Sequence, residues 1–233
     1  MLLFLLALAA FGGWWLMRQG LATRPWLEAG PLDGMRPHRT PPLPAAKVGL
    51  GVFIAVATAL LLLLLSAYSM RMEMADWSPP PQPPVLWANT AVLVLASLAL
   101  HRAQRAVQRG DRGGAGFGLL AGGGASLVFV IGQLAAWRQL AGAGYVPSSN
   151  PADAFFYLIT AVHGLHLLGG LVALGGAAAK LRRGVPMDRL RLGVELCAAY
   201  WHFLLIAWLV LFGTMAFSPS FDWLVALCMA PFR

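Results

Sequence analysis

The chain has 233 residues, of which 59% are hydrophobic and only 11% are charged. Soluble domains carry about 25% charged residues, so this composition excludes an ordinary soluble protein and predicts an integral membrane protein. The formal net charge of +8 does not indicate a nucleic acid partner. The basic residues lie in short loops between apolar segments, where they attract anionic lipid headgroups.

Six uncharged or nearly uncharged segments follow one another along the chain. Each is near the length of about 20 residues that crosses roughly 30 Å of hydrocarbon as a helix. We therefore predict an all-α fold, a polytopic membrane bundle of six transmembrane helices. The segments are Leu2–Met17, Val48–Tyr68, Val85–Leu100, Phe117–Trp137, Ala154–Ala179 and Gly193–Phe217.

A proline-rich loop, Gly20–Ala46, separates the first predicted helix from the other five. We divide the chain into an N-terminal transmembrane helix with this cytoplasmic loop (residues 1–46), a five-helix core (residues 47–217) and an outward-facing C-terminal tail (residues 218–233). The tail is apolar from Trp223 onward, but it is too short to span a bilayer, so we expect it to lie at the membrane interface.

Lysine and arginine are distributed unevenly between the two sides of the predicted bundle. Three loops, after the first, third and fifth helices, hold five, four and five of the 17 Lys and Arg residues. By the positive-inside rule these loops are cytoplasmic, which places the N-terminus and the C-terminus outside. The predicted location is a bacterial-type inner (cell) membrane, crossed several times.

Four ionisable side chains lie inside the last two apolar segments. His163 and His166 share one face of a helix, and Glu195 and His202, seven residues apart, share a face of the next helix. Ionisable groups at bilayer depth are costly, so they normally face protein, a partner or water. We predict that they join two neutral side chains in an interhelical polar network, which consists of His163, His166, Glu195, His202, Thr160 and Gln133.

Two other uses of these residues remain open from their chemistry alone. Imidazoles and a carboxylate are acceptable ligands for a metal ion, and a His/Glu set could relay protons in a pump or transporter. A structural hydrogen-bond network is favoured, because a histidine pair at this spacing has no further Cys or Asp cluster beside it. We therefore expect no catalytic residue, no metal ligand and no cofactor ligand in this chain.

The polar residues lie in two motifs that resemble subunit III of the haem-copper respiratory oxidases. Residues Thr160–Leu167 are similar to the family's Thr-Gly-x-His-Gly-x-His-Val signature. Glu195, followed by Tyr200–Phe203 and then Trp208, resembles its Glu…Tyr-Trp-His-Phe…Trp signature. Three further matches occur in the family's order: Lys47–Gly49 through Phe53 to Tyr68, Leu86–Ala91, and Gln133 with Trp137. The motif residues expected to serve in packing are Asn89, Thr90, Tyr200, Trp201, Phe203 and Trp208.

The resemblance implies a non-catalytic subunit of a terminal oxidase that couples dioxygen reduction to proton pumping in aerobic respiration. Subunit I, which carries the haem and copper, and subunit II are the implied partners, together with membrane lipids. Bound phospholipid, stabilisation of the complex and help with proton delivery are the implied roles. Two family positions that are often acidic are Ala57 and Leu205 here, which weakens the expectation of proton delivery.

Two alternatives remain, and they differ from this interpretation in the partner that the protein would have. One is a relative of subunit III that is associated with nitric oxide reductases. The other is a free-standing membrane transporter that uses the His/Glu set and functions without a partner.

Overall fold

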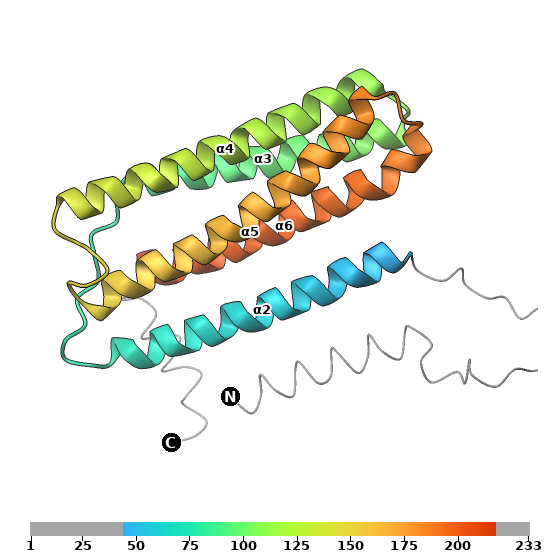
Figure 1. The fold of residues 1–233 in the computed structure, drawn as a ribbon. Coiled ribbons are helices and arrows are strands. Elements are labelled where there is room, and N and C mark those ends of the chain that lie inside the picture. Colours follow the sequence, from blue (N-terminus) through green and yellow to red (C-terminus); the bar gives the residue numbers. More distant parts are fainter. Residues whose placement is uncertain (1–43, 218–233) are drawn as a thin grey trace, which may run out of the picture. The chain divides into compact units, whose positions relative to one another are not determined.

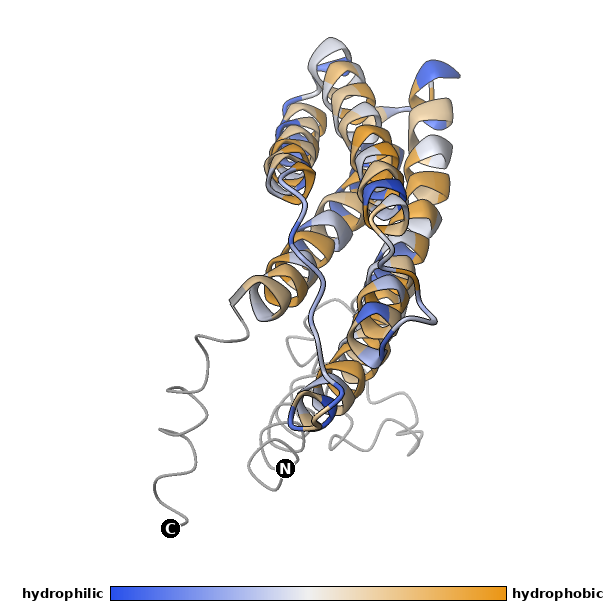
Figure 2. Cartoon of the chain, turned by 90° about the vertical axis from the view of Figure 1, so that its left-hand side faces the viewer, coloured by the Kyte–Doolittle hydropathy of each residue, from blue (hydrophilic) through white to orange (hydrophobic). Residues whose placement is uncertain are grey.

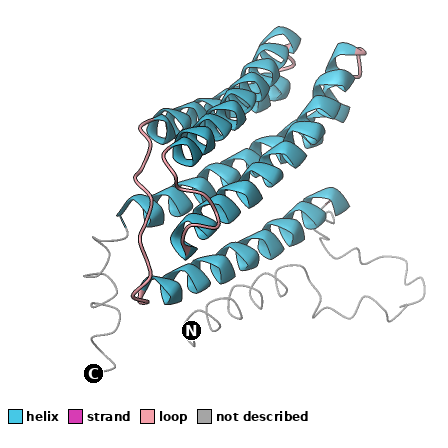
Figure 3. Ribbon diagram, turned by 60° about the vertical axis from the view of Figure 1, so that its left-hand side comes forward, coloured by secondary structure: helices cyan, strands magenta, loops and turns pink. Residues whose placement is uncertain are grey.

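The computed structural model describes residues 44–217, which form five long helices (Figures 1 and 3). All five are long and apolar enough to cross a membrane, and the described part of the chain contains no strand. The all-α prediction and five of the six predicted spans are therefore confirmed. The predicted helix Leu2–Met17 and the C-terminal tail lie outside the described residues. The helices are α2 (Ala45–Met72), α3 (Val85–Gln108), α4 (Arg112–Gly142), α5 (Pro151–Arg182) and α6 (Met187–Phe217).

Short polar side chains begin two of the helices. The Asp111 carboxylate accepts a hydrogen bond from the Gly114 amide at 2.9 Å, which satisfies one of the free N–H groups at the start of α4. Asn150 caps α5 in the same way, with Pro151 in the first turn, where its missing N–H costs nothing. These caps fix where α4 and α5 enter the bundle.

Arg112 links the start of α4 to the end of α5. Its guanidinium donates to the carbonyl oxygens of Leu181 at 3.2 Å and Gly184 at 3.0 Å, and also to that of Val185. The last carbonyl groups of a helix have no partner within the helix, so one planar side chain with several donors suits this position. The connection after α5 is thereby held against α4.

The helices α3, α4, α5 and α6 pack around the buried core, whereas α2 contacts α5 and α6 (Figure 1). No residue in the most apolar stretch of α2 is buried, compared with a third to a half of the corresponding stretches of the other four helices. Apolar residues run along the helices, and hydrophilic ones gather near their ends and in the loops (Figure 2). Such an apolar exterior suits a surrounding of lipid or of other apolar helices.

Glycines let α3 and α4 approach closely. A Cβ atom at Gly118 would lie 2.7 Å from Ala103 Cβ and 2.9 Å from the Ala103 backbone, and a Cβ atom at Gly122 would lie 2.6 Å from Leu100 Cγ. Helices in a membrane gain stability mainly from packing contacts, and small residues allow those contacts to form. The α3–α4 pair therefore depends on glycine at both positions.

Candidate functional site

Tryptophans of α6 join it to two other helices through hydroxyl groups. Trp201 Nε1 donates to Ser126 Oγ on α4 at 2.8 Å, and Trp208 Nε1 donates to Thr90 Oγ1 on α3 at 2.9 Å. The Trp201 and Ser126 side chains are fully buried. An indole N–H that is out of reach of water needs an acceptor, so these pairs fix the rotation of α6 against its neighbours.

The same arrangement joins α4 to α5. Trp137 Nε1 donates to Thr160 Oγ1 at 3.1 Å. Each of the three hydroxyl groups in turn donates to the carbonyl oxygen four residues earlier in its own helix, so each hydroxyl both accepts and donates. These carbonyl oxygens belong to Leu86, Gly122 and Phe156.

The predicted site histidines lie in three different surroundings. His202 is joined to Ser97 of α3 by a hydrogen bond of 2.5 Å between Nδ1 and Oγ, and its ring centroid lies 5.6 Å from that of His101. His166 Nδ1 donates to the carbonyl oxygen of Val162 in its own helix at 2.8 Å. His163, only 4% exposed, packs against two aromatic rings, and its Nε2 has no hydrogen-bond partner among the described residues.

Those two rings belong to Phe129 and Trp208, with centroids 5.8 Å and 5.2 Å from the His163 ring. Gln133, another predicted member of the network, is buried, and neither atom of its side-chain amide is hydrogen bonded to any residue that the structure describes. Aromatic faces can accommodate an imidazole by packing, but they satisfy its ring nitrogens only weakly. The middle of the bundle therefore holds polar groups with unused hydrogen-bonding capacity.

Glu195 pairs with Lys47 of α2, and the two side chains are each 35% exposed. The Lys47 Nζ atom donates to Glu195 Oε1 at 2.6 Å, across 148 positions of the sequence. This is the ion pair by which α2 is joined to α6. Glu195 lies near the end of α6 that follows the basic connection, so its partner is a lysine at the corresponding end of α2 rather than a histidine in the middle of the bundle.

Among the described residues, three of the four predicted network members have separate hydrogen-bond partners: Glu195 with Lys47, His202 with Ser97, and His166 with the Val162 carbonyl oxygen. His163 Nε2 has no partner there. A single network that joins His163, His166, Glu195 and His202 stays a prediction. Helical spacing shows which residues share a face, but it does not show the rotation of one helix against the next. Thr160 does take part in an interhelical hydrogen bond, with Trp137.

The motif residues are mostly interhelical contacts. Asn89 Nδ2 donates to the carbonyl oxygen of Phe129 on α4 at 3.2 Å, and Tyr200 donates from its hydroxyl to the carbonyl oxygen of His166 on α5 at 3.0 Å. Phe203 stacks on Tyr200, with ring centroids 6.3 Å apart.

The predicted site residues did not include Ser97, Ser126 and Lys47. The serines could have been noticed as polar residues inside apolar segments, but nothing in the sequence identifies their partners.

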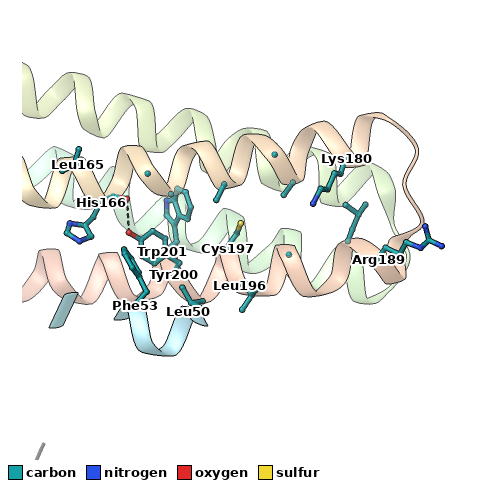
Figure 4. A pocket seen from close by; sticks show the side chains of 17 residues that line it. Leu50, Phe53, Leu165, His166, Lys180, Arg189, Leu196, Cys197, Tyr200 and Trp201 are labelled. Carbon is teal, nitrogen blue, oxygen red and sulfur yellow. Dashed lines mark hydrogen bonds between the residues drawn. The ribbon is translucent and has the colours of Figure 1, made fainter. Parts of the chain in front are cut away.

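A groove with a volume of about 710 Å³ lies between α2, α5 and α6. Its wall along α5 is made of small residues, including Gly169, Ala173 and Gly176. Lys180 and Arg189 lie towards the α5–α6 connection, and the group formed by Phe53, His166 and Tyr200 lies towards the other end (Figure 4). The groove is thus long, mainly apolar and cationic at one end.

Among the described residues there is no cluster of three or more His, Cys, Asp or Glu side chains that could hold a metal ion. Several of the polar groups connect helices, and His166, Lys180 and Arg189 line the groove.

A sequence model of the family described as cytochrome c oxidase subunit III matches residues 47–219. The chain belongs to the cytochrome c oxidase subunit III family. The match extends over all five described helices, and a member of this family with five membrane-capable helices is a multi-pass membrane protein.

Individual relatives agree with the family assignment. Cytochrome c oxidase subunit 3 of Thermostichus vulcanus is 30% identical over 181 residues, which is 75% of this chain and 88% of the relative. Cytochrome c oxidase subunit 3 of Synechocystis sp. is 31% identical over 127 residues, 53% of this chain and 52% of the relative, so the chain matches about half the length of that protein. These names favour the oxidase interpretation over a nitric oxide reductase relative or a transporter.

Proposed function

We propose that this protein is a non-catalytic subunit III that lies beside the catalytic subunit I and subunit II of a terminal oxidase, which reduces dioxygen and pumps protons in aerobic respiration. Its own contribution is to hold phospholipid in the groove between α2, α5 and α6 and so to stabilise the working complex. The observation that carries this proposal is the groove itself, apolar along its length with Lys180 and Arg189 at one end.

The chemistry of the groove suits an anionic or zwitterionic phospholipid. Glycine and alanine on α5 leave room for an acyl chain along the helix surface, and the volume lies within the range of about 300–1,000 Å³ typical of ligand pockets. Neither Lys180 nor Arg189 belongs to an ion pair among the described residues, so both cations remain available to a phosphate group.

The Lys47–Glu195 pair has a supporting role in this proposal. Lys47 lies close in sequence to the groove residue Leu50, and Glu195 lies next to Leu196, which also lines the groove. Glu195 neutralises Lys47 and joins α2 to α6, so the groove keeps its third wall. With the basic connections in the cytoplasm, as the positive-inside rule requires, the headgroup end of the groove faces the inner leaflet of the cell membrane.

Haem and copper belong to the partner subunit in this proposal. Ala57 and Leu205 carry no ionisable group at positions where the family often has acids, so the role that we propose is stabilisation by lipid rather than proton transfer through these positions.

The test compares two double variants of the complete oxidase, purified in mild detergent. Lys180→Gln/Arg189→Gln removes the two cations of the groove. Arg183→Gln/Arg191→Gln removes two exposed cations from the same region that do not line it. We expect the first variant to lose tightly bound phospholipid, measured by mass spectrometry of the extracted complex, and to inactivate faster during sustained turnover. Equal lipid content and equal lifetime in the two variants would contradict the proposal.

A further inference from the structure

A second, much smaller cavity lies between α2, α5 and α6. Its volume is about 30 Å³, and it is lined mainly by aliphatic residues of the three helices. The exceptions are the aromatic ring of Phe203 and two imidazoles, those of His163 and His166, and the small side chain of Ala57 lies on the α2 side. One water molecule requires at least about 10–15 Å³ by this measure, so the cavity is large enough for one.

One ring nitrogen at this cavity, Nε2 of His163, has no hydrogen-bond partner among the described residues. This nitrogen is buried. A buried polar atom without a partner is costly, and in folded proteins such atoms are usually satisfied by protein or by an ordered water molecule. The aliphatic residues around the cavity offer no side-chain donor or acceptor.

The second imidazole has a defined orientation of its proton. A carbonyl oxygen only accepts, so the hydrogen bond between His166 Nδ1 and the Val162 carbonyl places a proton on Nδ1. In the neutral ring, Nε2 is then an acceptor. A water molecule can donate one hydrogen to His166 Nε2 and use its remaining capacity for His163, as donor or as acceptor according to the His163 tautomer.

We propose that this cavity binds an ordered water molecule that bridges the imidazoles of His163 and His166. Ala57 makes the site possible, because a larger apolar side chain on this face of α2 would occupy the space that the water needs. The bridge supplies the polar link between neighbouring imidazoles that no direct hydrogen bond provides. This inference does not depend on lipid in the larger groove.

The experiment uses the full chain, labelled with ¹⁵N-histidine and placed in lipid bilayers, and measures magnetisation transfer from water protons to the imidazole nitrogens by solid-state NMR. The His163 signals are identified by their loss in His163→Phe. We expect clear transfer from water to His163 Nε2, although that side chain is buried and lies at bilayer depth. Transfer at His101 but not at His163 would overturn the proposal.

A pair of matched variants locates the water. Ala57→Leu fills the cavity, and Ala55→Leu makes the same change at an exposed position on the same helix. We expect the transfer to His163 to be lost in Ala57→Leu and kept in Ala55→Leu. Ala57→Val serves the same purpose if Ala57→Leu fails to fold. Transfer to His163 that persists in a folded Ala57→Leu or Ala57→Val variant would contradict a water bridge. Loss of the transfer when the wild-type protein is treated with a metal chelator would contradict it as well.

Discussion

Replacing Ser126 with alanine tests the buried contact between α4 and α6. The change removes one oxygen atom and with it the acceptor of the 2.8 Å hydrogen bond from Trp201 Nε1. Both side chains are fully buried, so the indole N–H finds no water in place of the hydroxyl. Interhelical hydrogen bonds in bilayers contribute about 0.6 kcal/mol on average and about 1.7 at most. Leaving a buried donor unsatisfied costs about 1–3 kcal/mol. We expect Ser126→Ala to lower the free energy of unfolding by about 1–2 kcal/mol.

The assay is reversible unfolding of the purified chain in mixed micelles, with a double-mutant cycle that adds Trp201→Phe. The coupling energy between the two changes should be about 0.6–1.7 kcal/mol, because each variant alone removes the same hydrogen bond. Ser69→Ala is the matched control, because Ser69 is exposed and its hydroxyl, within the described part of the chain, bonds only to the Leu65 carbonyl oxygen of its own helix. If Ser126→Ala were as stable as Ser69→Ala and the coupling energy were zero, the reasoning about buried indole donors would be refuted.

Three further predictions concern other parts of the molecule. Gly118→Ala should destabilise the α3–α4 pair by about 1–3 kcal/mol through overpacking against Ala103, whereas Gly124→Ala, with nothing within 4 Å, should be neutral or stabilising in the same unfolding assay. Glu195→Gln should weaken assembly of the oxidase, measured as subunit retention on purification, more than it lowers initial turnover. Glu73 is an exposed acid without an ion pair among the described residues, so Glu73→Gln should change neither subunit retention nor initial turnover. If Glu195→Gln lowered initial turnover immediately and as much as it lowered subunit retention, a direct role in proton transfer would be favoured. The hydrogen bond from Arg71 holds the pKa of the Asp76 carboxyl below its ordinary value. The stability that this pair contributes is therefore present above about pH 4 and is lost as the pH falls through the lowered pKa. An NMR titration in which Asp76 keeps its ordinary pKa would contradict this prediction.

The membrane helices could be predicted from the sequence because each requires a run of apolar residues of fixed length. Their ends could not be located in this way. The predicted segment Val85–Leu100 continues to Gln108 in the structure, and Phe117–Trp137 extends to Arg112 and Gly142. Arginine is a good helix former and its long side chain can reach the headgroups, so a charged residue ends the hydrocarbon span without ending the helix.

The candidate site was predicted less completely than the fold. The motifs contain many of the residues that connect the helices, and the cost of polar groups in hydrocarbon explains why those residues need partners. The partners themselves depend on how far each helix is rotated and shifted. Nothing in the sequence pairs Lys47 with Glu195, which lies 148 positions away, and Ser126 carries no signal beyond being polar.

The stripe of small residues on α5 illustrates the same limit. Small residues such as Gly169 and Ala173 are typical of tight helix packing in membranes. Both line the open groove instead, and no described atom lies within 4 Å of a Cβ atom built at Gly169. Gly170, the neighbour of Gly169, makes the close contact, since a Cβ atom there would lie 2.8 Å from the Tyr200 ring. Adjacent residues of α5 thus differ in their surroundings: Gly169 faces open space in the groove, and Gly170 packs against α6.

The most direct test of the proposed function is affinity purification of the tagged full chain from its own membranes, followed by an optical spectrum of the product. We predict that a catalytic oxidase subunit and its haem absorption accompany the chain, with dioxygen consumption in the same sample. If the chain emerges alone, without haem absorption, and moves protons or a solute when reconstituted, the assignment to an oxidase complex is contradicted.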